Sequence, residues 1–238
     1  MVRGLRRAGL AVAAALVVVA AAGSSSVQLR GSLVDGSFAS KAVRGRVGFE
    51  VYLPPSYAMS KARYPVVYFL HGLPASASAF RGTGTFAEAF EAAGRPAILV
   101  GPQGARDGDD DPEYLDWGTG RNWETAIGTE LPRYIDSHFR TIRGRHGRAL
   151  VGLSAGGYGA VLLALHRLEA FSVIESWSGY FHPTDPSGAH TLNLGSRAAN
   201  RRASAHTFVH SLRRAFRRQP TFFAFYVGTQ DSRFRAEN

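Results

Sequence analysis

The stretch ALVGLSAGGYGA, residues 149–160, decides the fold of this chain. An apolar run meets the sequence Gly-Leu-Ser-Ala-Gly at residues 152–156, and apolar residues at helical spacing follow as far as Leu168. That order predicts a strand, a sharp turn with Ser154 at its apex, and a helix. The flanking glycines leave room for such a turn because they carry no side chain. Ser154 is therefore a candidate nucleophile, and a glycine-rich turn without a catalytic role is the alternative.

Apolar segments that alternate with helical patterns lie on both sides of this stretch. Strands are expected at residues 47–53, 64–70, 98–100, 171–177 and 222–227, and helices at 85–93, 123–139 and within 201–218. Strands that alternate with helices predict an α/β fold, with a mainly parallel sheet and helices on both faces. We expect one domain over residues 44–238, preceded by a lead-in at 23–43.

Residues 1–22 have a composition of their own. Arg3, Arg6 and Arg7 precede an uncharged run of alanine, valine and leucine, and small residues follow. This is the pattern of a cleaved secretory signal peptide, so we expect a secreted or extracytoplasmic protein. An uncleaved membrane anchor is the alternative, and the pattern leaves Sec and twin-arginine export both open.

Composition narrows the class of protein further. The chain has no cysteine, so it forms no disulfide, and its formal net charge is +10. The excess positive charge is concentrated in Arg197, Arg201, Arg202, Arg213, Arg214, Arg217 and Arg218. These side chains form either a basic face toward anionic envelope polymers or a solvated helix surface. No nucleic-acid module, internal repeat or zinc-ligand spacing is present, and the sequence leaves the oligomeric state open.

Five ordered motifs carry a resemblance to a known family. They are YLPP at 52–55, FLHGL at 69–73, WE to ELP at 123–132, GLSAGGYG at 152–159 and GTQD at 228–231. Together they resemble the Putative esterase family of α/β-hydrolases, which contains antigen 85 mycolyltransferases, feruloyl esterases and S-formylglutathione hydrolase. The His-Gly at residues 71–72 is closer to the esterase branch. The resemblance implies an α/β-hydrolase fold and a serine esterase or acyltransferase that acts on a small-molecule or envelope acyl ester.

The resemblance also implies roles for individual residues. Ser154 would be the nucleophile that forms an acyl-enzyme, and Asp231 would be the acid of a catalytic triad. The backbone N–H groups of Leu73 and Ala155 would form the oxyanion hole, and Gly72 would let the backbone approach a substrate carbonyl. A turn aspartate without a catalytic role is the alternative for Asp231. No metal or cofactor is expected.

The catalytic histidine has no evident position. In this fold the triad runs Ser, acid, His along the chain, whereas every histidine precedes Asp231. The histidines are His71, His138, His146, His166, His182, His190, His206 and His210. We expect a structural hydrogen-bonding role for His71, with a rewired base at His182 or His206 as an alternative.

The missing histidine leads to a further expectation about the whole chain. It predicts a domain truncated before its last helix and strand, with catalysis impaired. A non-catalytic envelope-binding protein on a hydrolase scaffold and a fragment without independent function are the alternatives.

A polar loop at residues 104–120 precedes the helix predicted at 123–139. Its carboxylates are Asp107, Asp109, Asp110 and Asp111. Clustered carboxylates bind Ca²⁺, but this spacing does not follow an EF-hand loop, so we interpret the stretch as an acidic solvated loop near the mouth of the site. Trp117 and Trp123 would either line an acyl pocket or pack the loop onto the sheet.

Overall fold

The computed structural model describes residues 29–73, 75–109, 112–185, 190–232 and 234–235. The predicted signal peptide at residues 1–22 lies outside these ranges, as do Asp110 and Asp111. Within the described part of the chain, no helix is long and apolar enough to span a membrane.

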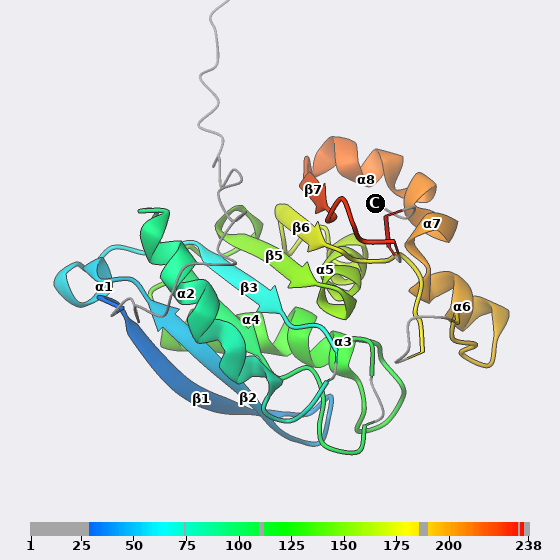
Figure 1. Ribbon diagram of the computed structural model, residues 1–238, viewed down its shortest axis with the longest axis horizontal. Coiled ribbons are helices and arrows are strands. Elements are labelled where there is room, and N and C mark those ends of the chain that lie inside the picture. The colour runs from blue at the N-terminus through cyan, green and yellow to red at the C-terminus, as the bar shows by residue number, and fades with distance from the viewer. Residues whose placement is uncertain (1–28, 74, 110–111, 186–189, 233, 236–238) are drawn as a thin grey trace, which may run out of the picture.

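The centre of the molecule is a seven-stranded sheet (Figure 1). Its strands are β1 (Ser32–Ser40), β2 (Gly45–Leu53), β3 (Val66–Leu70), β4 (Ile98–Pro102), β5 (Arg148–Leu153), β6 (Val173–Trp177) and β7 (Phe222–Tyr226). Their spatial order is β1-β2-β4-β3-β5-β6-β7. The pairings of β2 with β1 and β4 are antiparallel, whereas every pairing from β4 to β7 is parallel. The mainly parallel sheet confirms the predicted fold class.

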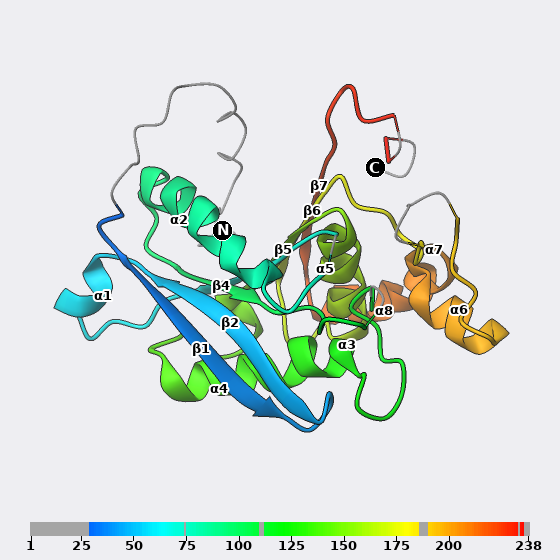
Figure 2. The same ribbon diagram turned by 60° about the horizontal axis from the view of Figure 1, so that its bottom comes forward.

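Helices lie on both faces of this sheet (Figure 2). The longer ones are α2 (Thr83–Ala92), α4 (Leu131–His138) and α5 (Ala155–His166). Shorter segments are α1 (Ser56–Met59), α3 (Trp123–Thr125), α6 (Arg197–Ala203), α7 (Ala205–Phe208) and α8 (Arg213–Arg218). The segments α6, α7 and α8 lie between β6 and β7 in the chain, and Figure 1 shows them together at the side of the sheet where these two strands lie.

Alternate residues of β3 belong to the two hydrophobic layers that flank the sheet. Val66, Tyr68 and Leu70 pack in the layer that contains α4 and α5. Val67 and Phe69 pack in the layer that contains α2. All five residues are buried, since successive side chains of a strand point to opposite faces and both faces are covered here. This burial explains why the run VVYFL has no charged residue.

The predicted helix at residues 123–139 is interrupted. A π-helical segment, Ala126–Glu130, separates α3 from α4. Pro132 lies in the first turn of α4 and has no N–H to donate to the carbonyl four residues earlier, so the α-helical hydrogen-bond ladder breaks there. The predicted helix within residues 201–218 is also divided into short segments, because Ser204 adopts an extended conformation with φ −111° and ψ 105°.

Strand β1 is an element that the sequence pattern does not predict. Its sequence SLVDGSFAS contains glycine, aspartate and serines, which have low strand propensity. The strand forms through a continuous antiparallel register with β2, from Ser32 opposite Leu53 to Ser40 opposite Gly45. Pairing with a neighbouring strand therefore determines its conformation, rather than local sequence.

Candidate active site

Ser154 occupies a strained turn between β5 and α5. Its φ of 56° and ψ of −119° lie outside the ranges that side-chain-bearing residues favour. Its backbone N–H donates to the carbonyl oxygen of Trp177, at the end of β6, with an N···O distance of 2.9 Å. This conformation costs on the order of 1–3 kcal/mol, so the surrounding structure must hold it. The strand, turn and helix predicted around Ser154 are all present.

The glycines beside the turn allow α5 to approach the sheet. A Cβ atom on Gly152 would overlap the backbone of Gly156, and a Cβ atom on Gly156 would overlap the carbonyl of Leu70 in β3. Any larger residue at these positions would push the start of α5 away from β3 and β5. The glycines therefore place the N-terminal backbone of this helix, including the N–H of Ala155, close to the ends of the parallel strands.

A third glycine brings the loop after β3 against the serine turn. A Cβ atom on Gly72 would lie 3.2 Å from Cβ of Ser154 and 3.0 Å from the carbonyl oxygen of Leu153. Leu73 and Ala155, the two predicted oxyanion residues, both line one small, narrow hollow. The structure thus brings together two of the segments that the sequence motifs predict to form one site, the loop after β3 and the serine turn.

The ring of His71 holds this loop in place. Its Nδ1 lies 2.9 Å from the carbonyl oxygen of Gly72, and its Nε2 accepts the backbone N–H of Gly104 at 3.1 Å. Because Nε2 accepts, the proton must be on Nδ1, which donates to Gly72. Burial lowers the pKa of His71, which also favours this neutral ring. In addition, the hydroxyl of Tyr114 donates to the carbonyl oxygen of His71 at 2.8 Å. The structural role predicted for His71 is confirmed.

Asp231 lies in the turn that follows β7. Its backbone N–H donates to the carbonyl oxygen of Gly228 at 2.9 Å, and its Oδ1 accepts the N–H of Phe234 at 3.0 Å. The side chain is half-buried. In the sheet, β6 lies between β7 and β5, the strand that leads to Ser154. The assignment of Asp231 as the triad acid stays a prediction.

A histidine that accepted the proton of Ser154 would have to contact the hydroxyl of this serine, so the hydrogen bonds of the histidine rings are relevant. Between described residues, these bonds go to Gly72, Gly104, Glu124, Tyr134, Ser137, Asp185 and Arg202, and none goes to Ser154. Of the two alternative bases, His206 is exposed and packs edge-on against Phe181, with ring centroids 5.4 Å apart.

The loop at residues 104–120 is anchored by Asp109, which is buried and pairs with the more exposed Arg106, so its interpretation as an acidic solvated loop is wrong for this carboxylate. Asp109 is 5% exposed and accepts hydrogen bonds from Arg106 and from Nε1 of Trp123, at 3.1 and 3.0 Å. Burial by itself would raise the pKa of Asp109, but the hydrogen bonds from Arg106 and Trp123 lower it overall. Trp123 is fully buried and packs the loop onto the domain, whereas Trp117 is 38% exposed.

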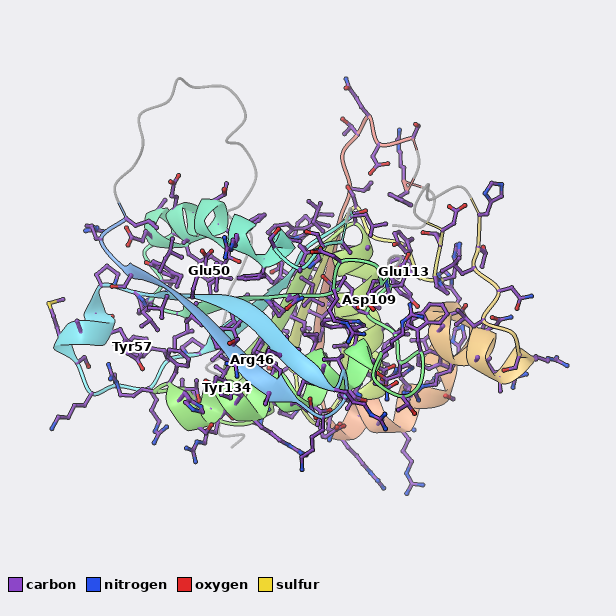
Figure 3. All side chains as sticks on the ribbon, turned by 90° about the horizontal axis from the view of Figure 1, so that it is seen from below. Arg46, Glu50, Tyr57, Asp109, Glu113 and Tyr134 are labelled. Atoms are coloured by element: carbon purple, nitrogen blue, oxygen red, sulfur yellow. The ribbon has the colours of Figure 1, made fainter. Side chains whose placement is uncertain are left out.

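Glu113 is a residue of the site that no sequence motif predicts. Its carboxylate is buried and accepts the hydroxyl of Tyr180 at 2.7 Å, together with the N–H and hydroxyl of Thr184 at 3.3 Å. Glu113 and Tyr114 have positive φ values of 51° and 53°, and both line the hollow that contains Leu73. Figure 3 shows Glu113 and Asp109 close together, far from Tyr57. Glu113 follows several aspartates in the sequence, and no local pattern there indicates that its carboxylate is buried.

Glu124, the acid of the WE motif, lies on α3 and bonds to residues at the end of α5 and on α6. Its Oε1 accepts from Arg167 at 2.7 Å and from Arg202 at 2.8 Å, and it lies 3.0 Å from Nδ1 of His166. Burial would raise the pKa of Glu124, but His166 and Arg167 outweigh this effect and lower the pKa to about 2. The motif therefore has a structural function, since it fixes the far end of α5.

Comparison with curated proteins gives relatives of this chain. It is 34% identical over 142 residues to Esterase Rv1288 of Mycobacterium tuberculosis, which is 60% of this chain and 31% of that protein. It is 32% identical over 143 residues to Diacylglycerol acyltransferase/mycolyltransferase Ag85A of Mycobacterium leprae, which is 56% of this chain and 41% of that protein. The chain therefore spans less than half the length of these relatives.

Solved structures share the fold. An S-formylglutathione hydrolase from Agrobacterium tumefaciens superposes with a TM-score of 0.68 at 24% identity, over 87% of this chain and 79% of that one. A ferulic acid esterase superposes with a TM-score of 0.61 at 21% identity, over 84% of this chain and 91% of that one. The Putative esterase family matches residues 40–237. With an α/β-hydrolase fold and a family match over most of its length, this chain belongs to the Putative esterase family.

Proposed function

We propose that this protein cleaves carboxylic esters through an acyl-enzyme on Ser154. The oxygen of Ser154 attacks the ester carbonyl carbon and loses its proton, which passes to the oxygen of the leaving alcohol as the bond from that oxygen to the carbonyl carbon breaks. Water, or the hydroxyl of an acceptor such as a sugar, takes the acyl group in the second half of the reaction. The observation that carries this proposal is the strained backbone of Ser154 at the start of α5, with φ 56° and ψ −119°.

Two backbone N–H groups would stabilise the oxyanion in this reaction. That of Ala155 belongs to the first turn of α5, where the helix dipole also favours negative charge. That of Leu73 comes from the loop after β3. The shared hollow of Leu73 and Ala155 supports this pairing. An oxyanion hole of this kind binds the transition state more strongly than the planar ester, and so it accelerates acylation.

Asp231 is the acid that we propose for the triad, and no described histidine is assigned as its partner. An experiment with imidazole addresses the base directly. Imidazole in solution can accept the serine proton, so a labelling rate that rises in proportion to imidazole concentration would show that acylation of this chain lacks an internal base. A rate that is independent of imidazole would place the base within the chain.

We also propose that the protein acts outside the cytoplasm. The support is the N-terminal pattern at residues 1–22, where arginines precede an uncharged apolar run. Expression of the full chain in a bacterial host, followed by fractionation and N-terminal sequencing, tests this proposal. An exported product that begins near residue 23 is the expected result, and a cytoplasmic product with its first residues intact would contradict it.

A fluorophosphonate probe tests the nucleophile. The full chain should be labelled at Ser154, and Ser154→Ala should abolish labelling. Ser137→Ala is the matched control, because Ser137 is an exposed serine on α4 whose hydroxyl donates to Tyr134. Labelling of Ser154→Ala at the wild-type rate would overturn the proposal.

A further inference from the structure

A groove beside α6 is lined by arginines and one aromatic ring. Its volume is about 460 Å³, and its lining residues are Arg197, Ala198, Arg201, Arg202 and Phe208. This volume is within the range of roughly 300–1,000 Å³ that is usual for small-molecule sites. The catalytic roles proposed above use none of these residues.

Two of the arginines in the groove carry charge that the described chain does not neutralise. Arg202 donates to Glu124 at 2.8 Å. The guanidinium groups of Arg197 and Arg201 are exposed and form no ion pair or hydrogen bond with a described residue. They are four residues apart on α6, so they lie on one side of the helix and repel each other. Arg197 is also at the N-terminal end, where a cation opposes the helix dipole. A bound anion would relieve both effects.

The remaining surface of the groove is apolar and held in place from behind. Phe208 stacks on the ring of His166, with centroids 5.2 Å apart and an interplanar angle of 27°. It also packs against the cluster that contains Ala203 and Tyr158. The hydroxyl of Tyr158 donates to the carbonyl oxygen of Ala203 at 2.7 Å, which links the end of α6 to the serine helix. The apolar surface is therefore present before any ligand binds.

The surrounding sequence adds to the positive potential. The arginine-rich segment, residues 197–218, contains no aspartate or glutamate. All of its arginines are exposed: Arg197, Arg201, Arg202, Arg213, Arg214, Arg217 and Arg218. A concave site within such a segment concentrates anions from solution. The arginines of α6 combine this charge with an apolar surface in one groove.

We infer that this groove binds a small amphiphilic carboxylate. The two carboxylate oxygens lie between the guanidinium groups of Arg197 and Arg201, which donate charge-assisted hydrogen bonds. The apolar part of the ligand covers Ala198 and Phe208. The volume of about 460 Å³ matches a single small molecule. Binding here involves no covalent step and does not depend on Ser154.

Calorimetric titration of the full chain with sodium octanoate at low ionic strength tests the inference. We expect one octanoate per chain, with an affinity that weakens as salt is added. Arg197→Gln combined with Arg201→Gln should weaken binding about tenfold, since two charge-assisted contacts are lost. The matched control is Arg213→Gln with Arg217→Gln, which removes the same charge from the same segment outside the groove. Compared at about 0.15 M salt, where the Debye length is about 8 Å, it should change the dissociation constant less than about twofold, because charges farther away are screened.

Further ligands and variants distinguish binding in this groove from general attraction of anions or of apolar molecules. Octanol has the apolar chain without the negative charge, and inorganic phosphate has negative charge without an apolar chain. Both should therefore bind at least about tenfold more weakly than octanoate. Ser154→Ala should leave octanoate binding unchanged. Equal weakening by both pairs of arginine substitutions, binding only to vesicles of anionic lipid, or binding of octanol as tight as that of octanoate would each overturn the inference. Circular dichroism and thermal unfolding of each variant confirm that it is folded, and Arg201→Gln alone provides a milder test.

Discussion

Nδ1 of His71 donates to the carbonyl oxygen of Gly72 across 2.9 Å. That carbonyl and the N–H of Leu73 belong to the same planar peptide unit, so fixing one fixes the direction of the other. The N–H of Leu73 is the donor that we propose for the oxyanion. A half-buried side chain whose two ring nitrogens both bond to backbone therefore sets the orientation of the N–H group that we propose for the oxyanion.

Replacement of His71 should reduce catalysis more than substrate binding. In His71→Ala, the Gly72 carbonyl and the Gly104 N–H both lose their partner. Loss of one oxyanion donor typically costs about 10²–10³ in rate, so a misdirected one should lower kcat by at least about tenfold. KM should change little. Steady-state kinetics with a short-chain p-nitrophenyl ester measures both, and an increase in KM with unchanged kcat would contradict this role.

The same ring predicts the acid limb of the pH–rate profile. Burial lowers the pKa of His71 below its usual 6.5, so in the folded protein the ring stays neutral until the pH falls to the lowered pKa. Protonation places a hydrogen on Nε2 and breaks its bond with the N–H of Gly104. Activity and the stabilisation from the neutral ring should be complete above pH 6.5 and decline as the pH falls through the lowered pKa. In His71→Asn this component of the profile should disappear, and its persistence would assign the limb to another group.

Gly72→Ala should impair acylation without unfolding the domain. Its Cβ atom would lie 3.2 Å from Cβ of Ser154, so either the loop or the serine must move by a few tenths of an ångström. Since a misplacement of about 1 Å can cost about 10²-fold in rate, a shift of a few tenths of an ångström should lower the rate by roughly several-fold. The rate of fluorophosphonate labelling measures the effect, while thermal unfolding serves as the control. Labelling at the wild-type rate would show that the two segments do not act together.

Gly156→Ala should destabilise the fold itself. The new methyl group would overlap the carbonyl of Leu70, which is backbone and cannot rotate away, so we expect a loss of about 1–3 kcal/mol in the free energy of unfolding. Gly82→Ala is the matched control, because nothing lies within 4 Å of its Cβ position. Urea denaturation of both variants compares them, and equal stability would contradict the tight packing of α5 on β3.

Glu124→Gln should destabilise the protein at neutral pH by about 3 kcal/mol, because it leaves Arg167, whose side chain is 16% exposed, without the buried carboxylate that pairs with it. The pKa of Glu124 is about 2 in the folded state against 4.5 for a free side chain. Its stabilisation is therefore complete above pH 4.5 and is lost as the pH falls toward 2. Urea denaturation at pH 7 and pH 3 should show a smaller difference between variant and wild type at pH 3. A constant difference would exclude this carboxylate as the cause.

The sequence predicts the parallel strands of the sheet well, including the edge strand β7, but it does not predict the opposite edge strand β1. The β3 strand is buried on both faces, so its apolar run is unambiguous, and the turn at Ser154 is encoded by local glycines. The conformation of β1 depends on pairing with β2, which no local pattern reveals. The break in the helix at Ala126–Glu130 arises from one residue, Pro132, whose effect extends to the preceding turn.

The candidate site shows the same division. The motifs predict that Ser154, Leu73 and Ala155 lie close to one another, because glycines mark the turns that bring these residues together. Glu113 could not be found, since its burial depends on Tyr180 and Thr184, which are distant in the sequence. An acidic residue in an acidic stretch resembles a surface residue until its tertiary partners are known.

The left-handed backbone conformation at Ser154 lowers the stability of the fold at the position of the proposed nucleophile. Glycine adopts φ values near 56° without strain, so a variant with glycine at this position should fold with a larger free-energy gap than the natural chain. Any process that selected only for thermal robustness would therefore replace the serine. The natural chain therefore keeps a hydroxyl at a position whose backbone conformation disfavours any residue with a side chain.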